Sequence, residues 1–340
     1  MVSHQNTGNP HLETDLWRWL IFDSGLSRRR IKNLILQNAQ SSALSLFWQA
    51  GPEVFAQQLG LDETETAAIK AAAGVWPELQ ARWDAERRAG LMTLRINEPG
   101  YPAPLTRHFP PEERPLLLFL RGEPGLVELP MILPVAETSP EAEVEAWAME
   151  TLAELTEEGA LALFMAQPGL HARLVQIFLD AAIPFALIIP QGLAAYEPPA
   201  GLRRALDEER VLLVSPFQPE WTPPAQGPNP LLPHAVAFAR ALASALLALT
   251  PLPTPPFPDQ PCFAPPDAAP MAYAEPYVGP EELFLRLAES TAPSTSHQTP
   301  TPSPEPELDP ITPEEILETL TQGGRVPPAL AARLQQKKQQ

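Results

Sequence analysis

The chain has 340 residues, with 41 Asp and Glu against 23 Lys and Arg, which gives a formal net charge of −18. Its single cysteine excludes a disulfide scaffold and a cysteine-based zinc site. No apolar run reaches the roughly 18 residues of a membrane-spanning helix, and no basic start followed by an apolar stretch indicates a signal peptide, so we expect a soluble cytoplasmic protein with no membrane partner.

The charge is distributed unevenly along the chain. Residues 1–130 carry 13 basic and 15 acidic groups, residues 131–250 carry 5 and 14, and residues 251–340 carry 5 and 12. Because phosphates are neutralised by Lys and Arg, broad DNA binding by the whole surface is disfavoured. An anion-binding surface is therefore expected in the first third of the chain.

Helices are predicted over residues 15–90, after a disordered N-terminus at residues 1–14. The segment DLWRWLIFDSGLSRRRIKNLILQNA contains two helical stretches joined by a glycine turn, and Ile31, Leu34 and Ile35 give the second stretch an apolar face. Basic side chains follow the turn directly, namely Arg28, Arg29, Arg30 and Lys32.

This turn resembles a helix-hairpin-helix element, although Ser27 stands where such elements usually have a second glycine. The first N–H groups of a helix lack intrahelical partners, and beside basic side chains they suit a phosphate. One interpretation is therefore sequence-independent contact with nucleic-acid phosphates through the four basic residues. The other, which such patterns more often reflect, is a solvated basic face on a structural helix.

From residue 91 to residue 250, short apolar strands alternate with amphipathic helices. Helices are expected over residues 141–158, 170–182 and 202–209, and strands at LMTLRI, PLLLFLRG, PMILPV, ALALFMA, PFALII and VLLVSPF. This alternation is typical of an α/β fold with a Rossmann-like, mostly parallel sheet and helices on both faces. A ligand of such a fold lies at the carboxyl ends of the strands.

Few side chains capable of chemistry follow these strands. Glu137, Thr138 and Ser139 come after PMILPV, and Gly192 comes after PFALII. Thr138, Ser139 and Gly192 are candidates for a phosphate pocket, but Glu137 has the wrong charge for one. Thr138 and Ser139 serve equally well as caps for the helix that begins near Glu141, and we favour that interpretation.

Motifs of catalysis are missing from the sequence. It contains no GxGxxG or GxxxxGK[ST] phosphate loop and no GxSxG nucleophile elbow. The six histidines lack metal-ligand spacing, and we interpret His171 and His234 as polar surface groups. We therefore expect no catalytic residue, no metal and no cofactor.

Proline dominates the chain after residue 250. Residues 251–310 contain 17 prolines and are predicted to form an extended, mostly disordered linker, with one short helical island from Glu281 to Ala288. Residues 311–340 favour two short helices, because Thr312 is a suitable N-cap and Pro313 fits the first helical position. Two short helices make at best a small docking unit.

The order of these elements resembles that of the DprA/Smf family of DNA-processing proteins. The resemblance covers about residues 15–250 and rests on the stretches SGLSRRRIKNLIL, EPGYPAPL, RPLLLFLRGEP, IIPQGLAAYEPP, LLVSPFQPEWTPP and PLLPHAVAFARALASALLAL. It implies an N-terminal helical domain followed by a Rossmann-like domain. It also implies binding of single-stranded DNA and loading of a RecA-type recombinase during natural transformation, and it leaves homodimer formation open.

The departures from the family pattern concern its DNA pocket. Where the family has a VG[ST]R turn, this chain has Val135–Thr138; where it has SG.A.G.D..AH, this chain has Met165–His171; and where it has RNR, this chain has His234–Val236. The glycines and basic groups that hold phosphates are lost. Each lost charge-assisted contact costs roughly 1.5–3 kcal/mol, so DNA affinity is expected to be weakened.

Three hypotheses follow from these observations. In the first, the protein is a non-catalytic DprA-like protein of DNA uptake or recombination, in which DNA contact has moved to Arg28, Arg29, Arg30 and Lys32 or protein–protein contact dominates. In the second, it is a degenerate scaffold that acts through protein–protein contacts without DNA binding. The third, an enzyme acting on a nucleotide-derived ligand, has the least support because no acid–base pair, nucleophile or phosphate loop is present.

Overall fold

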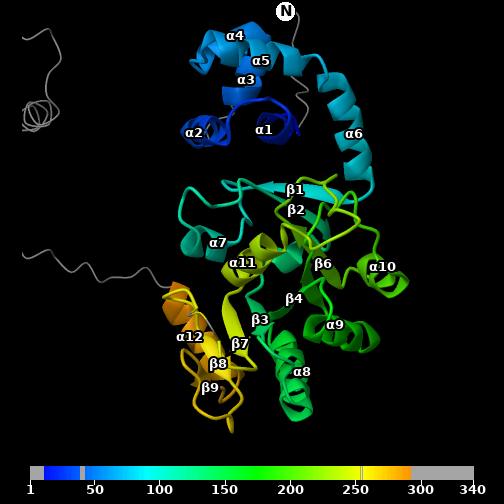
Figure 1. The fold of residues 1–340 in the computed structure, drawn as a ribbon, viewed down its shortest axis with the longest axis vertical. Coiled ribbons are helices and arrows are strands. Elements are labelled where there is room, and N and C mark those ends of the chain that lie inside the picture. The colour runs from blue at the N-terminus through cyan, green and yellow to red at the C-terminus, as the bar shows by residue number, and fades with distance from the viewer. Residues whose placement is uncertain (1–10, 39–42, 253, 255, 292–340) are drawn as a thin grey trace, which may run out of the picture. The chain divides into compact units, whose positions relative to one another are not determined.

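The computed structural model describes residues 11–291 except 39–42, 253 and 255. Its first part is helical, as predicted (Figure 1). The first helix begins at Leu12, so the expected disordered N-terminus is too long by three residues, and its first ten residues lie outside the described part. The helices are α1 (Leu12–Phe22), α2 (Arg28–Asn38), α3 (Ala43–Gln49), α4 (Pro52–Gln58), α5 (Glu63–Ala73) and α6 (Trp76–Arg88).

Aromatic side chains form the centre of this helical part. The ring of Trp19 lies 4.7 Å from that of Trp48 and 6.1 Å from that of Trp76. Trp83 continues the cluster, 5.6 Å from Trp76, in an edge-on contact. Since large aromatic rings bury much apolar surface with little loss of conformational entropy, they hold six short helices together.

The second part is built on a nine-stranded sheet with the order β1-β2-β6-β5-β4-β3-β7-β8-β9. β1 pairs with β2 and β2 with β6 in antiparallel fashion, and the remaining neighbours are parallel. This agrees with the predicted Rossmann-like, mostly parallel sheet. The strands are β1 (Leu91–Arg95), β2 (Leu117–Gly122), β3 (Met131–Val135), β4 (Leu161–Met165), β5 (Phe185–Ile188), β6 (Val211–Ser215), β7 (Ala245–Ala248), β8 (Cys262–Ala264) and β9 (Glu275–Pro276).

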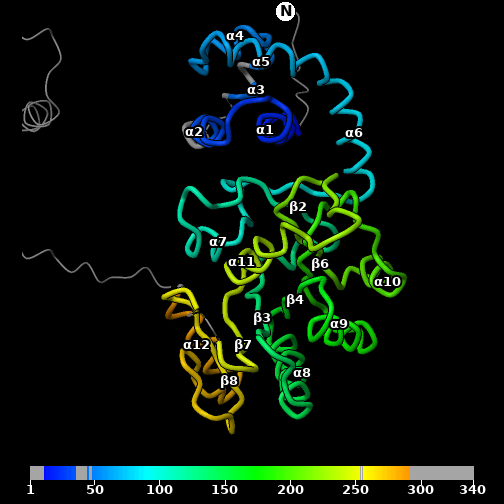
Figure 2. The backbone as a smooth tube through the Cα atoms, viewed as in Figure 1, coloured from blue at the N-terminus to red at the C-terminus, as the bar shows by residue number. Residues whose placement is uncertain are grey.

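Helices cover both faces of the sheet, which can be followed along the backbone in Figure 2. Successive residues of a strand point to opposite faces, so Leu163 belongs to one apolar core and Phe164 to the other. No helix in the described part is both long enough and apolar enough to cross a membrane. The helices of this part are α7 (Ala103–His108), η1 (Pro124–Glu128), α8 (Ala142–Glu157), α9 (Leu170–Asp180), α10 (Ala200–Asp207), α11 (Leu232–Leu242) and α12 (Pro280–Thr291).

The region after residue 250 differs from the predicted linker. β8 and β9 extend the sheet beyond β7, and α12 buries Leu283 and Leu287 against the same core as Phe263. These strands have only three and two residues, too few to show a strand pattern among so many prolines. Proline is tolerated here because Pro276 lies in the outermost strand, where a missing N–H breaks no ladder bond. The rest of the predicted linker, residues 292–310, and the predicted helices at 311–340 lie outside the described residues.

Candidate functional site

The turn before α2 is closed by its own hydrogen bonds. Gly25 has a φ of +74°, which favours glycine, and the hydroxyl of Ser24 accepts a hydrogen bond from the Leu26 N–H at 3.2 Å. The Ser27 hydroxyl accepts one from the Arg30 N–H at 3.3 Å. Ser27 therefore acts as a cap for α2, which gives a local reason for serine at the position where a second glycine was expected.

The basic residues at the start of α2 have different surroundings. Arg28 and Arg29 are exposed, and neither lies within ion-pair distance of a carboxylate in the described part of the chain. Arg30 instead donates to the Gly60 carbonyl at 2.6 Å and forms an ion pair with Glu65 at 3.2 Å. Its guanidinium thus fastens α2 to the turn between α4 and α5.

Lys32 is half-buried at the edge of this basic group. Its pKa is lowered, first by burial and then by repulsion from Arg28 and Arg114, while Glu112 and Glu113 oppose that shift. Arg114 comes from the loop between α7 and β2 and donates from Nε to the Phe109 carbonyl at 2.9 Å. Arg114 was not predictable as part of this group, because no sequence pattern relates two residues so far apart in the chain. Together, Arg28, Arg29, Lys32 and Arg114 form what we term the α2 surface.

The proposed phosphate-pocket residues after β3 are exposed and do not cap α8. Glu141 is the N-cap of α8, and no side chain makes the capping hydrogen bond, so the favoured interpretation of Thr138 and Ser139 as caps is wrong. The loop is held instead by the Glu137 N–H, which donates to the Thr250 hydroxyl after β7 at 2.9 Å. A cross-loop contact of this kind cannot be predicted from the local sequence.

Gly192 is buried where the loop after β5 meets the loop after β6. Its N–H donates to the Trp221 carbonyl at 2.8 Å. A Cβ at this position would lie 2.1 Å from the Pro219 carbonyl oxygen and 2.3 Å from that of Gln218. The glycine is therefore required by the close approach of two backbones, and its N–H already has a partner within the protein.

One basic side chain near this edge of the sheet is neutralised. Arg173, in the first turns of α9, donates from Nε and Nη2 to the two carboxylate oxygens of Glu145 on α8, at 2.7 and 2.6 Å. This hydrogen bonding lowers the pKa of Glu145 and keeps it ionised. With Glu137 and Glu143 nearby in sequence, the carboxyl ends of β3 and β4 have little capacity to attract a phosphate.

Two histidines of this part differ in their exposure. His171 is 7% exposed, beside the ring of Phe164, and burial lowers its pKa to about 4, so its interpretation as a surface group is wrong. His234 is exposed, as expected. No cluster of three or more His, Cys, Asp or Glu side chains suited to a metal ion is found within the described ranges.

Comparison with known proteins gives similarity at the level of structure only. No family model matches the chain, and no curated protein matches it. The chain is similar to the X-ray structure of DNA processing protein A (DprA) from Streptococcus pneumoniae, with 14% identity, a TM-score of 0.53, and coverage of 78% of this chain and 95% of that one. For DNA processing protein A from Helicobacter pylori, in a structure concerned with its single-stranded DNA binding, the identity is 15%, the TM-score 0.42, and the coverage 58% and 96%. The first of these similarities agrees with the order of elements described above: this chain has a DprA-like fold.

Proposed function

We propose that the protein is a non-catalytic DNA-processing protein that binds single-stranded DNA through the α2 surface. The observation that carries the proposal is the exposure of Arg28 and Arg29, two consecutive residues at the start of a helix, in a chain with a DprA-like fold. Basic side chains at a helix start, beside N–H groups without intrahelical partners, bind phosphates without regard to base sequence.

The biological role that fits this proposal is the delivery of a bound single strand to a RecA-type recombinase in the cytoplasm, during DNA uptake or recombination. The similar protein from Streptococcus pneumoniae is described as a DNA processing protein, which supports a role of this class. The proposal assigns no reaction, cofactor or metal to the chain. The proposal also includes a homodimer of this chain as a possible assembly.

The charge distribution sets the expected strength of binding. The α2 surface offers two exposed guanidinium groups and two partly buried basic groups on a molecule whose net charge is −18. Each phosphate contact with a single strand contributes about −0.7 to the slope of log affinity against log salt, so two or three contacts give a slope of about −1.4 to −2.1. We therefore expect binding that is measurable at low salt and weak at moderate salt.

The test is fluorescence anisotropy with a labelled oligothymidylate over a series of salt concentrations. In the double variant Arg28→Glu and Arg29→Glu, affinity at low salt should fall about tenfold or more, because two attractions become repulsions. The matched control, Arg203→Glu with Arg204→Glu, changes two adjacent arginines on α10 and should retain most of the binding. Equal loss in both variants would refute the α2 surface as the DNA site.

A second candidate function is a scaffold that acts through protein–protein contacts without DNA binding. The observation that favours it is the paired and acidic character of the strand ends, where Arg173 is bound by Glu145 and the Gly192 N–H is bound by Trp221. Under this proposal the wild-type protein does not change the anisotropy of the oligonucleotide even at low salt. That result would rule out the first proposal and leave the second.

A further inference from the structure

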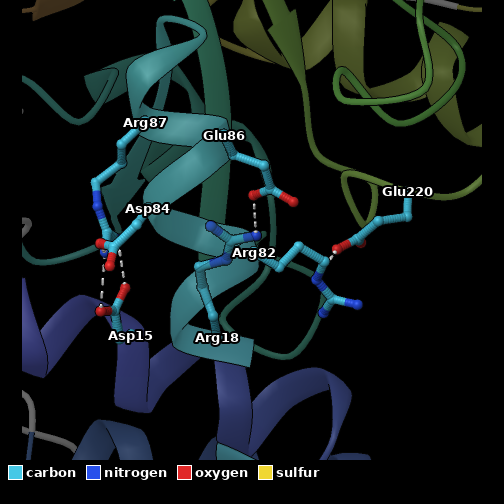
Figure 3. A network of polar contacts seen from close by, with 7 residues as sticks. All are labelled: Asp15, Arg18, Arg82, Asp84, Glu86, Arg87 and Glu220. Atoms are coloured by element: carbon cyan, nitrogen blue, oxygen red, sulfur yellow. Dashed lines mark hydrogen bonds and ion pairs between the residues drawn. The ribbon is translucent and has the colours of Figure 1, made fainter. Parts of the chain in front are cut away.

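Ionisable side chains from α1, α6 and the loop after β6 meet beside the helical part of the molecule (Figure 3). Arg18 donates from Nη2 to Glu86 Oε2 at 2.6 Å, and the two side chains are only 3% and 9% exposed. The Arg18 guanidinium also lies 5.0 Å from the ring of Trp83 and 5.4 Å from that of Phe119 in β2. A buried cation thus joins α1, α6 and the sheet.

Glu220 adds the loop after β6 to this contact. Its carboxylate oxygen Oε1 lies 2.8 Å from Arg82 Nε on α6. The pKa of Glu86 is raised first by burial and also by the nearby Glu220 carboxyl, against the attraction of Arg18. The pKa of Asp23, at the end of α1, is raised by burial and by Glu220, while Arg82 and Arg18 lower it. The Glu220 side chain therefore faces both helices of this cluster.

The backbone carbonyls on either side of Glu220 accept hydrogen bonds from the loop after β5, whereas the Glu220 side chain contacts α6. The Pro219 carbonyl accepts hydrogen bonds from the N–H groups of Ala194 and Ala195, at 2.9 and 3.1 Å. The Trp221 carbonyl accepts one from the Gly192 N–H at 2.8 Å. The Glu220 side chain thus forms an ion pair with the helical part, while the carbonyls of its two neighbours are hydrogen-bonded to the loop at the carboxyl end of β5.

We propose that Glu220 is a positioning residue that couples the helical part of the protein to the strand-end loop of residues 190–195. Through Glu220, α6 holds the turn of residues 218–221, and the carbonyls of that turn hold the amides of the 190–195 loop. The conformation of this loop, at the sheet edge where ligands of Rossmann-like folds bind, then depends on contacts made by α1 and α6. This coupling does not rest on DNA binding by the α2 surface.

Hydrogen exchange of the full chain, followed by mass spectrometry, tests the coupling. In Glu220→Ala, the amides of Gly192, Ala194 and Ala195 should exchange roughly tenfold faster than in the wild type, while those of β3 and β4 keep their protection. Arg82→Gln, a milder change at a side chain that is 41% exposed, should give a smaller increase at the same amides. Glu208→Gln is the matched control, since it alters another ion-paired carboxylate and should leave the 190–195 loop unchanged.

Rescue separates coupling from a general loss of stability. The double variant Arg82→Glu with Glu220→Arg reverses the ion pair and places a cation beside Glu86, so it should restore much of the protection at residues 190–195. The proposal is wrong if these amides keep wild-type exchange in Glu220→Ala. It is equally wrong if exchange rises uniformly over the whole sheet in that variant, because the effect would then be global unfolding.

Discussion

The α2 surface and the carboxyl ends of the central strands both contain N–H and guanidinium groups that could bind an anion, but these groups are used differently in the two regions. At the α2 surface, Arg28 and Arg29 are exposed to solvent. At the strand ends, Arg173 is bound by Glu145 and the Gly192 N–H is bound by the Trp221 carbonyl. A polar group that already has a partner must lose it before it can bind a ligand, so we expect a phosphate to bind the first region in preference to the second.

The same contrast holds within the run of three arginines. Arg30 follows Arg28 and Arg29 directly, yet its guanidinium reaches the Gly60 carbonyl at 2.6 Å. Consecutive residues of a helix point in different directions, about 100° apart, so one of the three faces the neighbouring helices. A run of like charges therefore contains both surface groups and structural groups.

The largest expected change in the free energy of unfolding tests whether the close approach of two backbones requires a glycine at position 192. In Gly192→Ala the new Cβ would lie 2.1 Å from the Pro219 carbonyl oxygen, so the free energy of unfolding should fall by about 3 kcal/mol. Gly201→Ala is the control, because its Cβ would meet only Leu179 Cδ1 at an ordinary 3.7 Å and alanine is favoured in a helix. Urea denaturation measures both, and an unchanged midpoint for Gly192→Ala would contradict the packed loop.

The second prediction concerns the buried histidine beside the strand ends. Burial lowers the native pKa of His171 to about 4, whereas the unfolded chain takes up its proton near the ordinary value of 6.5. Protonation thus favours the unfolded state, and stability should fall by roughly 3 kcal/mol as the pH decreases from 6.5 to 4. In His171→Leu this part of the pH dependence should disappear from denaturation curves. A variant that loses stability with acid as steeply as the wild type would show that His171 is not its cause.

The smallest expected change in the free energy of unfolding concerns two arginines at the start of α2, Arg30 and Arg28. Arg30→Ala should lower the free energy of unfolding by about 1–2 kcal/mol, because it removes charge-assisted hydrogen bonds to a carbonyl and a carboxylate. Arg28→Ala should change it by no more than about 0.5 kcal/mol, as is usual for an exposed side chain. Thermal and urea denaturation of the two variants give the comparison. Equal destabilisation by both would remove the distinction between surface and structural arginines.

Much of the fold could be predicted because its periodicities are local. Helical spacing of apolar residues identified the helical region, and apolar strands alternating with amphipathic helices identified the parallel sheet. The edge strands β8 and β9 could not be found in this way, because they are two or three residues long and lie among prolines. Their stability comes from pairing with β7 and from the packing of α12, which are contacts at long range.

The candidate site was predictable only as a set of residue types. The sequence by itself determined that basic side chains follow a tight turn at a helix start, and that the strand ends lack the residues of a phosphate loop or a catalytic group. Only the tertiary structure decided that Arg30 is bound to Gly60, that His171 is buried, and that the Gly192 N–H is used by Trp221. The physical reason is that hydrogen-bond partners and burial depend on residues distant in the chain, whereas helix and strand patterns depend on neighbours.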